Sequence, residues 1–98
     1  MVYKIIGEFN DYILDKIIKK ISEDFVFLYY NNSLYISFKD INTLSRNSFN
    51  VKDVLKGSKN LALIEINQNN ILLEDEIAGE WCKNRFVDLE KQKFEKDK

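Results

Sequence analysis

The feature that most constrains the fold is a pair of apolar runs, FVFLYY at 25–30 and SLYISF at 33–38, separated by only two residues. Asn31 and Asn32 lie between them, and asparagine tolerates the positive φ that a two-residue hairpin turn requires. Such a turn fixes which residues of the two strands lie opposite each other. Because side chains alternate along a strand, the turn also assigns every residue of the hairpin to one of two faces.

The two predicted faces of this hairpin differ in polarity. The expected core face carries only apolar or aromatic side chains: Phe25, Phe27, Tyr29, Leu34, Ile36 and Phe38. The other face is half apolar and carries, among two serines, Val26, Leu28, Tyr30 and Tyr35. We expect a helix of the same chain to cover this second face. The alternative is that another protein covers it, because contiguous exposed apolar patches mark interaction sites.

Two amphipathic helices are predicted on either side of the hairpin in the sequence. In Asn10–Ser22, apolar residues recur every three or four positions, with an N-cap at the first or second residue. A second helix is predicted from Glu74 to about Phe94, with Arg85 in the middle of its apolar stripe. The stripe consists of Ile77, Ala78, Trp81, Cys82, Phe86 and Leu89. The only tryptophan and the only cysteine are therefore adjacent because both face the core.

The remaining segments predict shorter elements. Val2–Gly7 and Leu61–Ile66 are expected to be strands, and the second is apolar on both faces apart from one glutamate, which favours a central position in the sheet. The sequence VKDVLK at 51–56, between an asparagine and Gly57, is typical of one short helix. Ile71–Leu73 is expected to be a brief strand or a lead-in to the last helix.

These elements predict an α+β fold in one domain, residues 1–94, followed by a frayed tail at 95–98. With 98 residues and 45% hydrophobic composition, the chain is long enough for one packed core. The expected architecture is an antiparallel or mixed sheet of four or five strands with the two main helices on one face. The order of the elements is compatible with a ferredoxin-like variant.

The composition excludes most enzyme chemistry. The chain contains no histidine, which removes the usual general base, the commonest metal ligand and the partner of serine or cysteine nucleophiles. Cys82 lies on an apolar stripe, where a thiol stays protonated, and one cysteine cannot form a structural zinc site. A nuclease strand of the acid-x-lysine type is approached only by Glu65-Ile66-Asn67, which lacks the lysine. We therefore expect a non-enzymatic protein with no metal and no cofactor.

Charge is segregated along the chain although the net charge is only −1. The stretch between Asn60 and Cys82 has five acidic residues and no lysine or arginine, whereas 39–59 is mainly basic. This pattern predicts separate acidic and basic faces. Val87 and Phe94 lie off the apolar stripe, on the side of the last helix that carries acidic residues. The expected docking face for a basic protein comprises Glu65, Glu74, Asp75, Glu76, Glu80, Val87 and Phe94.

The leading functional hypothesis is a small inhibitor that binds another protein. Abundant Lys, Ile and Asn, with no Pro, indicate an AT-rich bacterial, phage or mobile-element genome, and such genomes encode immunity proteins, antitoxins and anti-CRISPR-type inhibitors. The acidic segment would block a basic, nucleic-acid-facing surface of a toxin, a nuclease or a CRISPR effector. A single cysteine and the absence of a signal peptide or a long apolar run predict a cytoplasmic protein with no membrane partner.

Two alternatives belong to other functional classes. One is a homo-oligomeric structural or accessory protein, in which Val26, Leu28, Tyr30 and Tyr35 close a symmetric dimer. The other is a small module for RNA or single-stranded DNA, which would stack bases on Tyr29, Tyr30 and Tyr35 and use lysines at 52, 56 and 59 for phosphates. The scarcity of arginine and the acidic segment argue against this nucleic-acid hypothesis.

Overall fold

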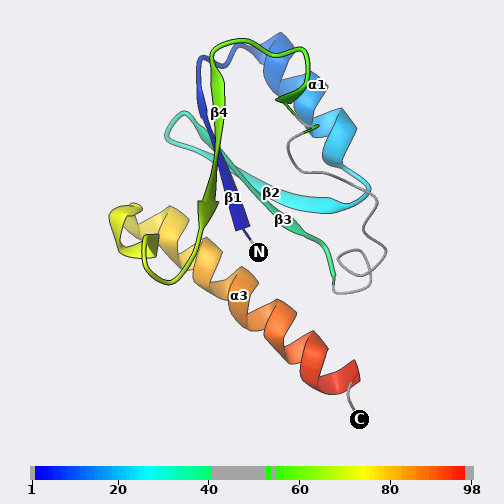
Figure 1. Ribbon diagram of the computed structural model, residues 1–98, viewed down its shortest axis with the longest axis vertical. Helices are drawn as coiled ribbons and strands as arrows, with labels where there is room; N and C mark the ends of the chain where they lie inside the picture. The colour runs from blue at the N-terminus through cyan, green and yellow to red at the C-terminus, as the bar shows by residue number, and fades with distance from the viewer. Residues whose placement is uncertain (1, 41–52, 54, 97–98) are drawn as a thin grey trace.

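Four antiparallel strands form the sheet in the computed structural model, which describes residues 2–40, 53 and 55–96 (Figure 1). Along the sheet the described strands have the order β2-β3-β1-β4. Their bounds are Val2–Gly7 for β1, Phe25–Tyr30 for β2, Ser33–Phe38 for β3 and Leu61–Ile66 for β4. Two long helices, α1 (Asp11–Ile21) and α3 (Glu76–Lys96), complete the described elements together with a short 3-10 turn, η2 (Ile71–Leu73). The predicted α+β fold is confirmed.

The hairpin has the turn and the register that the sequence predicts. Asn31 and Asn32 adopt φ angles of 52° and 61°, and Tyr30 lies opposite Ser33. β3 then pairs with β1 in the centre of the sheet, so the hairpin contributes both an edge strand, β2, and a central strand, β3.

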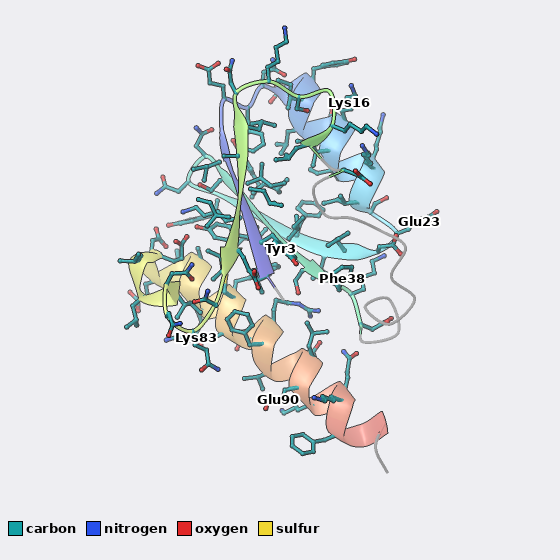
Figure 2. The ribbon with its side chains drawn as sticks, in the orientation of Figure 1. Tyr3, Lys16, Glu23, Phe38, Lys83 and Glu90 are labelled. Carbon is teal, nitrogen blue, oxygen red and sulfur yellow. The ribbon has the colours of Figure 1, made fainter. Side chains whose placement is uncertain are left out.

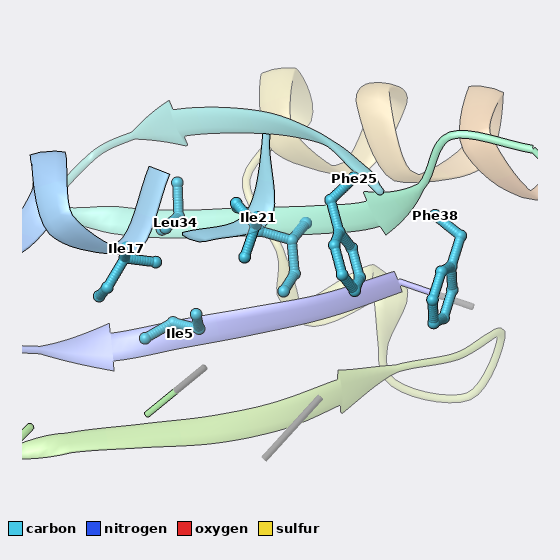
Figure 3. Packing of buried hydrophobic residues seen from close by; sticks show 7 residues of the cluster. Ile5, Ile17, Ile21, Phe25, Leu34 and Phe38 are labelled. Carbon is cyan, nitrogen blue, oxygen red and sulfur yellow. The ribbon is translucent and has the colours of Figure 1, made fainter. Parts of the chain in front are cut away.

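The first helix covers the apolar face of the sheet, as Figure 3 shows. Asn10 caps α1, because its side-chain Oδ1 accepts a hydrogen bond from the Ile13 amide at 2.8 Å. The buried cluster between α1 and the sheet consists of Ile5, Ile17, Ile21, Phe25, Leu34, Ile36 and Phe38. Phe25 and Phe38 stack with their ring centroids 4.6 Å apart. The predicted core face of the hairpin is therefore in the core, except where β2 reaches the edge of the sheet.

The second helix covers the opposite face, and this corrects the prediction that both helices lie on one face. A second buried cluster consists of Val2, Tyr35, Ile66, Ile71, Ala78 and Cys82. Figure 3 shows α1 in front of the sheet and α3 behind it. The physical reason is that the sheet carries large apolar or aromatic side chains on both faces, and on the second face Val2, Tyr35 and Ile66 would be left in water by a single layer of helices. As expected, a helix of the same chain covers the half-apolar face of the hairpin.

β4 lies at an edge of the sheet, whereas its apolar pattern predicted a central position. Among the described strands it pairs only with β1. Apolar residues on both faces of a strand indicate that both faces are covered, and they do not indicate that both edges are paired. Here Ile66 is buried under α3, and Leu61 and Leu63 pack against the cluster under α1.

The start of α3 differs from the prediction by two residues. The helix begins at Glu76, and Asp75 caps it by accepting hydrogen bonds from the amides of Ile77 at 2.9 Å and Ala78 at 3.4 Å. Residues 71–73 form η2 and no strand. α3 continues to Lys96, and its last turns project beyond the sheet in Figure 1. The short helix predicted at 51–56 lies mostly outside the described residues.

Arg85, predicted in the middle of the apolar stripe of α3, joins the helix to the end of β3. Its guanidinium donates to the carbonyl oxygens of Phe38 at 2.6 Å and Lys39 at 3.2 Å, and it pairs with Asp88 at 3.0 Å. The two terminal nitrogens of the guanidinium thus have backbone acceptors and a carboxylate, which offset the cost of placing a cation on an apolar stripe, whereas the buried Nε has no hydrogen-bond partner among the described residues.

Candidate functional site

The five acidic residues of the predicted docking face lie in four separate environments. Glu65 is opposite Tyr3 in the β1–β4 register, so its side chain is on the α1 side of the sheet. Burial, with a smaller contribution from Glu65, raises the pKa of Tyr3. Glu74 points inward and Asp75 caps α3, whereas Glu76 and Glu80 are exposed on the helix. Only the last two form an acidic surface on the α3 side.

Glu74 belongs to a buried polar cluster that we term the Glu74 cluster: Lys4, Tyr35 and Glu74. Its carboxylate Oε1 lies 2.8 Å from the Lys4 ammonium and accepts a hydrogen bond of 2.5 Å from the Tyr35 hydroxyl. The Lys4 ammonium also lies 5.5 Å from the centroid of the Tyr35 ring. The Glu74 side chain is only 8% exposed. This carboxylate therefore fastens the start of α3 to β1 and β3 and is not presented to a partner.

Cys82 lies in the same layer, and its thiol is unsuited to nucleophilic chemistry. Burial, followed by the nearby Glu74 carboxylate, raises its pKa to about 11, and the Lys4 ammonium opposes this only in part. The thiol is fully protonated at neutral pH, and a protonated thiol is a poor nucleophile. Burial and the hydrogen bond to Glu74 likewise raise the pKa of Tyr35 well above its usual value.

A shallow groove of about 510 Å³ runs between β2 and α3, and we name it the β2–α3 groove. Its lining residues come from the strand and from the first turns of the helix: Leu28, Glu76, Ile77, Glu80, Trp81 and Asn84. Leu28 and Trp81 are half-buried, whereas Ile77 is 57% exposed. Glu76 and Glu80 are one helical turn apart. The groove thus combines three apolar side chains with two carboxylates.

Three apolar residues near this groove were not in the predicted docking face. Ile77 was assigned to the core stripe, but it lies at the margin of that stripe and faces solvent. Leu72 and Leu73 are 82% and 85% exposed in η2, directly before α3. The sequence signal that could have predicted this surface is the occurrence of three large apolar residues within six positions, next to acidic residues. These residues are exposed to solvent because they lie in a 3-10 turn and at the margin of a helical stripe, whereas a strand or the centre of the stripe would have buried them.

Val87 and Phe94 are exposed on α3, as predicted, but they lie away from the groove. With a rise of about 1.5 Å per residue, they are roughly 10 Å and 21 Å farther along the helix than Glu80. Other solvent-facing residues of this part of α3, including Lys83 and Glu90, are labelled in Figure 2. The structure therefore separates this pair from the acidic residues that accompanied it in the prediction.

The fold also separates or buries the residues that each of the two alternative hypotheses places on one exposed face. Tyr35 is buried beneath α3, and Leu28 and Tyr30 pack against the same cluster, so α3 covers most of the proposed dimer face. Tyr29 points to the α1 side, and its hydroxyl donates to Asn32 Oδ1 at 3.0 Å. The three tyrosines do not share one exposed face. Lys52 lies outside the described residues.

A second cavity, of about 430 Å³, opens beside the start of α1 and is lined partly by Lys16 and Lys59. Within residues 2–40, 53 and 55–96, no three side chains of the metal-binding types come together. No helix in that part of the chain has an apolar stretch long enough to cross a bilayer. Comparison with family models, curated proteins and solved structures gave no match to this chain.

Proposed function

We propose that this chain is a small protein-binding inhibitor that covers a basic, nucleic-acid-facing surface of its partner with the β2–α3 groove. The observation that carries the proposal is the grouping of Glu76 and Glu80 with the exposed Ile77 over an apolar floor. The partner classes are those expected from the sequence, namely a toxin, a nuclease or a CRISPR effector. This mechanism requires no enzymatic step.

The groove has the two components that protein interfaces use. Apolar anchors supply most of the binding free energy when they become fully desolvated, and Ile77 and Trp81 have this role here. Carboxylates at the rim attract a basic partner and accelerate association, which makes binding dependent on salt. Leu72 and Leu73 extend the apolar surface at the same end of α3.

The proposal reduces the predicted docking face to the residues that the fold presents together. Glu76 and Glu80 contact the partner directly. Glu74 and Asp75 act indirectly, because they fix and cap the start of the helix that carries the groove. Glu65 lies on the other side of the sheet and takes no part.

The first test compares two charge-reversed variants in affinity capture from lysate of the source organism after nuclease treatment. Glu76→Lys/Glu80→Lys changes the groove. The matched control Asp15→Lys/Glu23→Lys makes the same change in net charge at two exposed positions, one on α1 and one just after it, the second of which is labelled in Figure 2. We expect wild type and control to retain one basic protein in stoichiometric amount. The groove variant should retain at least about tenfold less at low salt.

The second test concerns inhibition itself. The captured protein, once purified, is expected to bind nucleic acid alone and to lose that binding when the wild-type chain is added. Equal capture by the groove variant would contradict the proposed surface. Loss of every partner on nuclease treatment would favour the nucleic-acid hypothesis, and a captured protein that still binds nucleic acid would contradict the inhibitory mechanism.

A further inference from the structure

The outer edge of β2 presents backbone groups that no described strand pairs with. Tyr30 and Ser33 flank the two-residue turn and form a hydrogen-bonded pair, and such pairs alternate along an antiparallel ladder. The Lys39 amide donates to the Asp24 carbonyl at 2.9 Å, which continues the same alternation beyond the strand. The even-numbered residues of β2 therefore bond to β3. Phe27 and Tyr29 direct their amide and carbonyl groups outward.

This edge lacks the features that usually prevent an added strand. FVFLYY contains no charged residue and no proline, and its six-residue register with β3 is unbroken by a bulge. The strand is also flanked by exposed apolar surface on both sides. Phe27 and Tyr29 are 42% and 39% exposed on the α1 side, and the β2–α3 groove begins at Leu28 on the other.

The negative charge beside the β2 edge favours a basic segment as the added strand. A strand added next to β2 would direct alternate side chains over the β2–α3 groove, where Glu76 and Glu80 would face them. A second copy of this chain, paired antiparallel through its own β2, would place two such grooves on the same side of the joined sheet. Four carboxylates would then approach one another, and β2 has no basic residue to offset them. A basic segment meets complementary charge instead.

We propose, on the basis of the function proposed above, that the partner binds by adding an extended basic segment as a fifth strand along the outer edge of β2. The segment has the pattern Lys/Arg-x-apolar-x-Lys/Arg. Its three alternate side chains face α3: the apolar one enters the groove at Leu28, Ile77 and Trp81, and the two cations meet Glu76 and Glu80. The two cations are four positions apart in the strand, roughly 13 Å, whereas Glu76 and Glu80 are about 6 Å apart along the helix, so the long lysine or arginine side chains must reach inward from both sides of the apolar residue.

The test uses the capped peptide Lys-Thr-Leu-Thr-Lys-Thr as probe and the full chain as target. Amide exchange is followed by NMR for β2 with and without saturating peptide. We expect the amides of Phe27 and Tyr29 to become protected by at least about tenfold, because only a paired strand accepts hydrogen bonds from them. The scrambled peptide Lys-Leu-Thr-Thr-Lys-Thr, which moves leucine off the α3 side, should bind at least about tenfold more weakly.

Two variants separate backbone pairing from side-chain contact. Phe27→Pro removes the outward amide, whereas the control Phe27→Thr removes the same ring and keeps the amide. Both are first checked for native Trp81 fluorescence. We expect Phe27→Pro to weaken peptide binding at least about tenfold relative to Phe27→Thr. Glu76→Lys/Glu80→Lys should weaken it by a similar factor at low salt.

Three kinds of result would contradict the proposed strand addition or its sequence pattern. Peptide binding that perturbs Trp81 without protecting Phe27 and Tyr29 would overturn strand addition, while the function proposed for the groove would stand. No binding of the peptide, or equal binding of the scrambled peptide, would overturn the sequence pattern of the segment. Protection of Phe27 that rises with protein concentration alone would show pairing with a second copy and would also overturn the proposal. The capture experiment decides the proposed function independently of all these results.

Discussion

The two sides of the sheet are built from neighbouring residues, yet their interiors differ in kind. Along β1, Ile5 enters the cluster under α1, whereas Lys4 joins the Glu74 cluster under α3. Along β3, Leu34 and Tyr35 divide in the same way. The α1 side is held by apolar packing, which specifies little beyond volume and pattern. The α3 side adds a buried polar cluster whose atoms must meet in one geometry.

This difference matters for the proposed binding site, because the groove lies on the α3 side. Apolar packing alone would leave the rotation and register of α3 weakly determined, whereas the Glu74 cluster and the Arg85 contacts fix the helix at two points. With Glu74 held inward, Glu76 and Glu80 are directed toward solvent beside β2. The polar cluster thus positions the groove without contacting a partner.

The largest expected loss of stability comes from the α1 side. Ile5→Ala leaves a cavity in a fully buried apolar cluster and should lower the free energy of unfolding by about 2–5 kcal/mol. Urea denaturation measures this loss. The Trp81 emission of the folded variant should match wild type, because the α3 side is intact. A loss below about 1 kcal/mol would mean that the cluster under α1 is loosely packed.

Breaking the polar cluster should cost somewhat less stability and should disturb α3 specifically. Glu74→Ala leaves the Lys4 ammonium and the Tyr35 hydroxyl without their shared acceptor, for an expected loss of about 2–3 kcal/mol. The measurements are urea denaturation and Trp81 fluorescence, which should shift to the red as the start of α3 loosens.

The apolar replacement Lys4→Met/Glu74→Leu/Tyr35→Phe is the matched control for this cluster. It removes every member together, so no charge is left buried and unpaired, and it should recover most of the stability. The β2–α3 groove should still change in position, because the Glu74 cluster no longer fixes the orientation of α3. If the triple variant instead keeps wild-type binding of the Lys-Thr-Leu-Thr-Lys-Thr peptide, packing alone positions α3.

The helix caps offer a smaller comparison of the two sides. Asn10→Ala removes one capping hydrogen bond from α1, and Asp75→Ala removes the acceptor of two amides from α3. Each should cost about 1 kcal/mol, with the greater loss for Asp75 because a carboxylate also interacts with the helix dipole. Chemical denaturation of the two variants decides the order. A larger loss for Asn10→Ala would show that the Glu74 cluster holds the start of α3 without the cap.

The smallest expected effect is a change in the pH dependence of stability. It comes from ionisation of the Cys82 thiol and appears only in alkaline solution. The pKa of this thiol is raised from 9.0 to about 11, so between these values the unfolded chain loses the thiol proton before the folded chain does. The contribution to stability is therefore complete below pH 9 and is lost as the pH rises toward 11. Urea denaturation from pH 7 to pH 10.5 should show a steeper fall for wild type than for Cys82→Ala. Parallel curves would mean that the thiol is hydrated in the folded state.

The sequence by itself determined the local structure and one face of the core. The two asparagines between FVFLYY and SLYISF specify the turn, the register and the faces of the hairpin. The spacing of apolar residues in 10–22 gives α1 and its cap. These features are stabilised by interactions between residues a few positions apart in the sequence. A sequence pattern can therefore predict them.

Only the tertiary structure decided where α3 lies, which carboxylates reach solvent and which strand is at an edge. Periodicity could not distinguish Glu74 from Glu76, because the inward position of Glu74 depends on Tyr35, 39 residues earlier, and on Lys4. Ile77 was assigned to the core for the same reason, since only β2 and the sheet orientation reveal that its side of the helix is open. Such choices rest on contacts between distant segments, whose free energies no local pattern records.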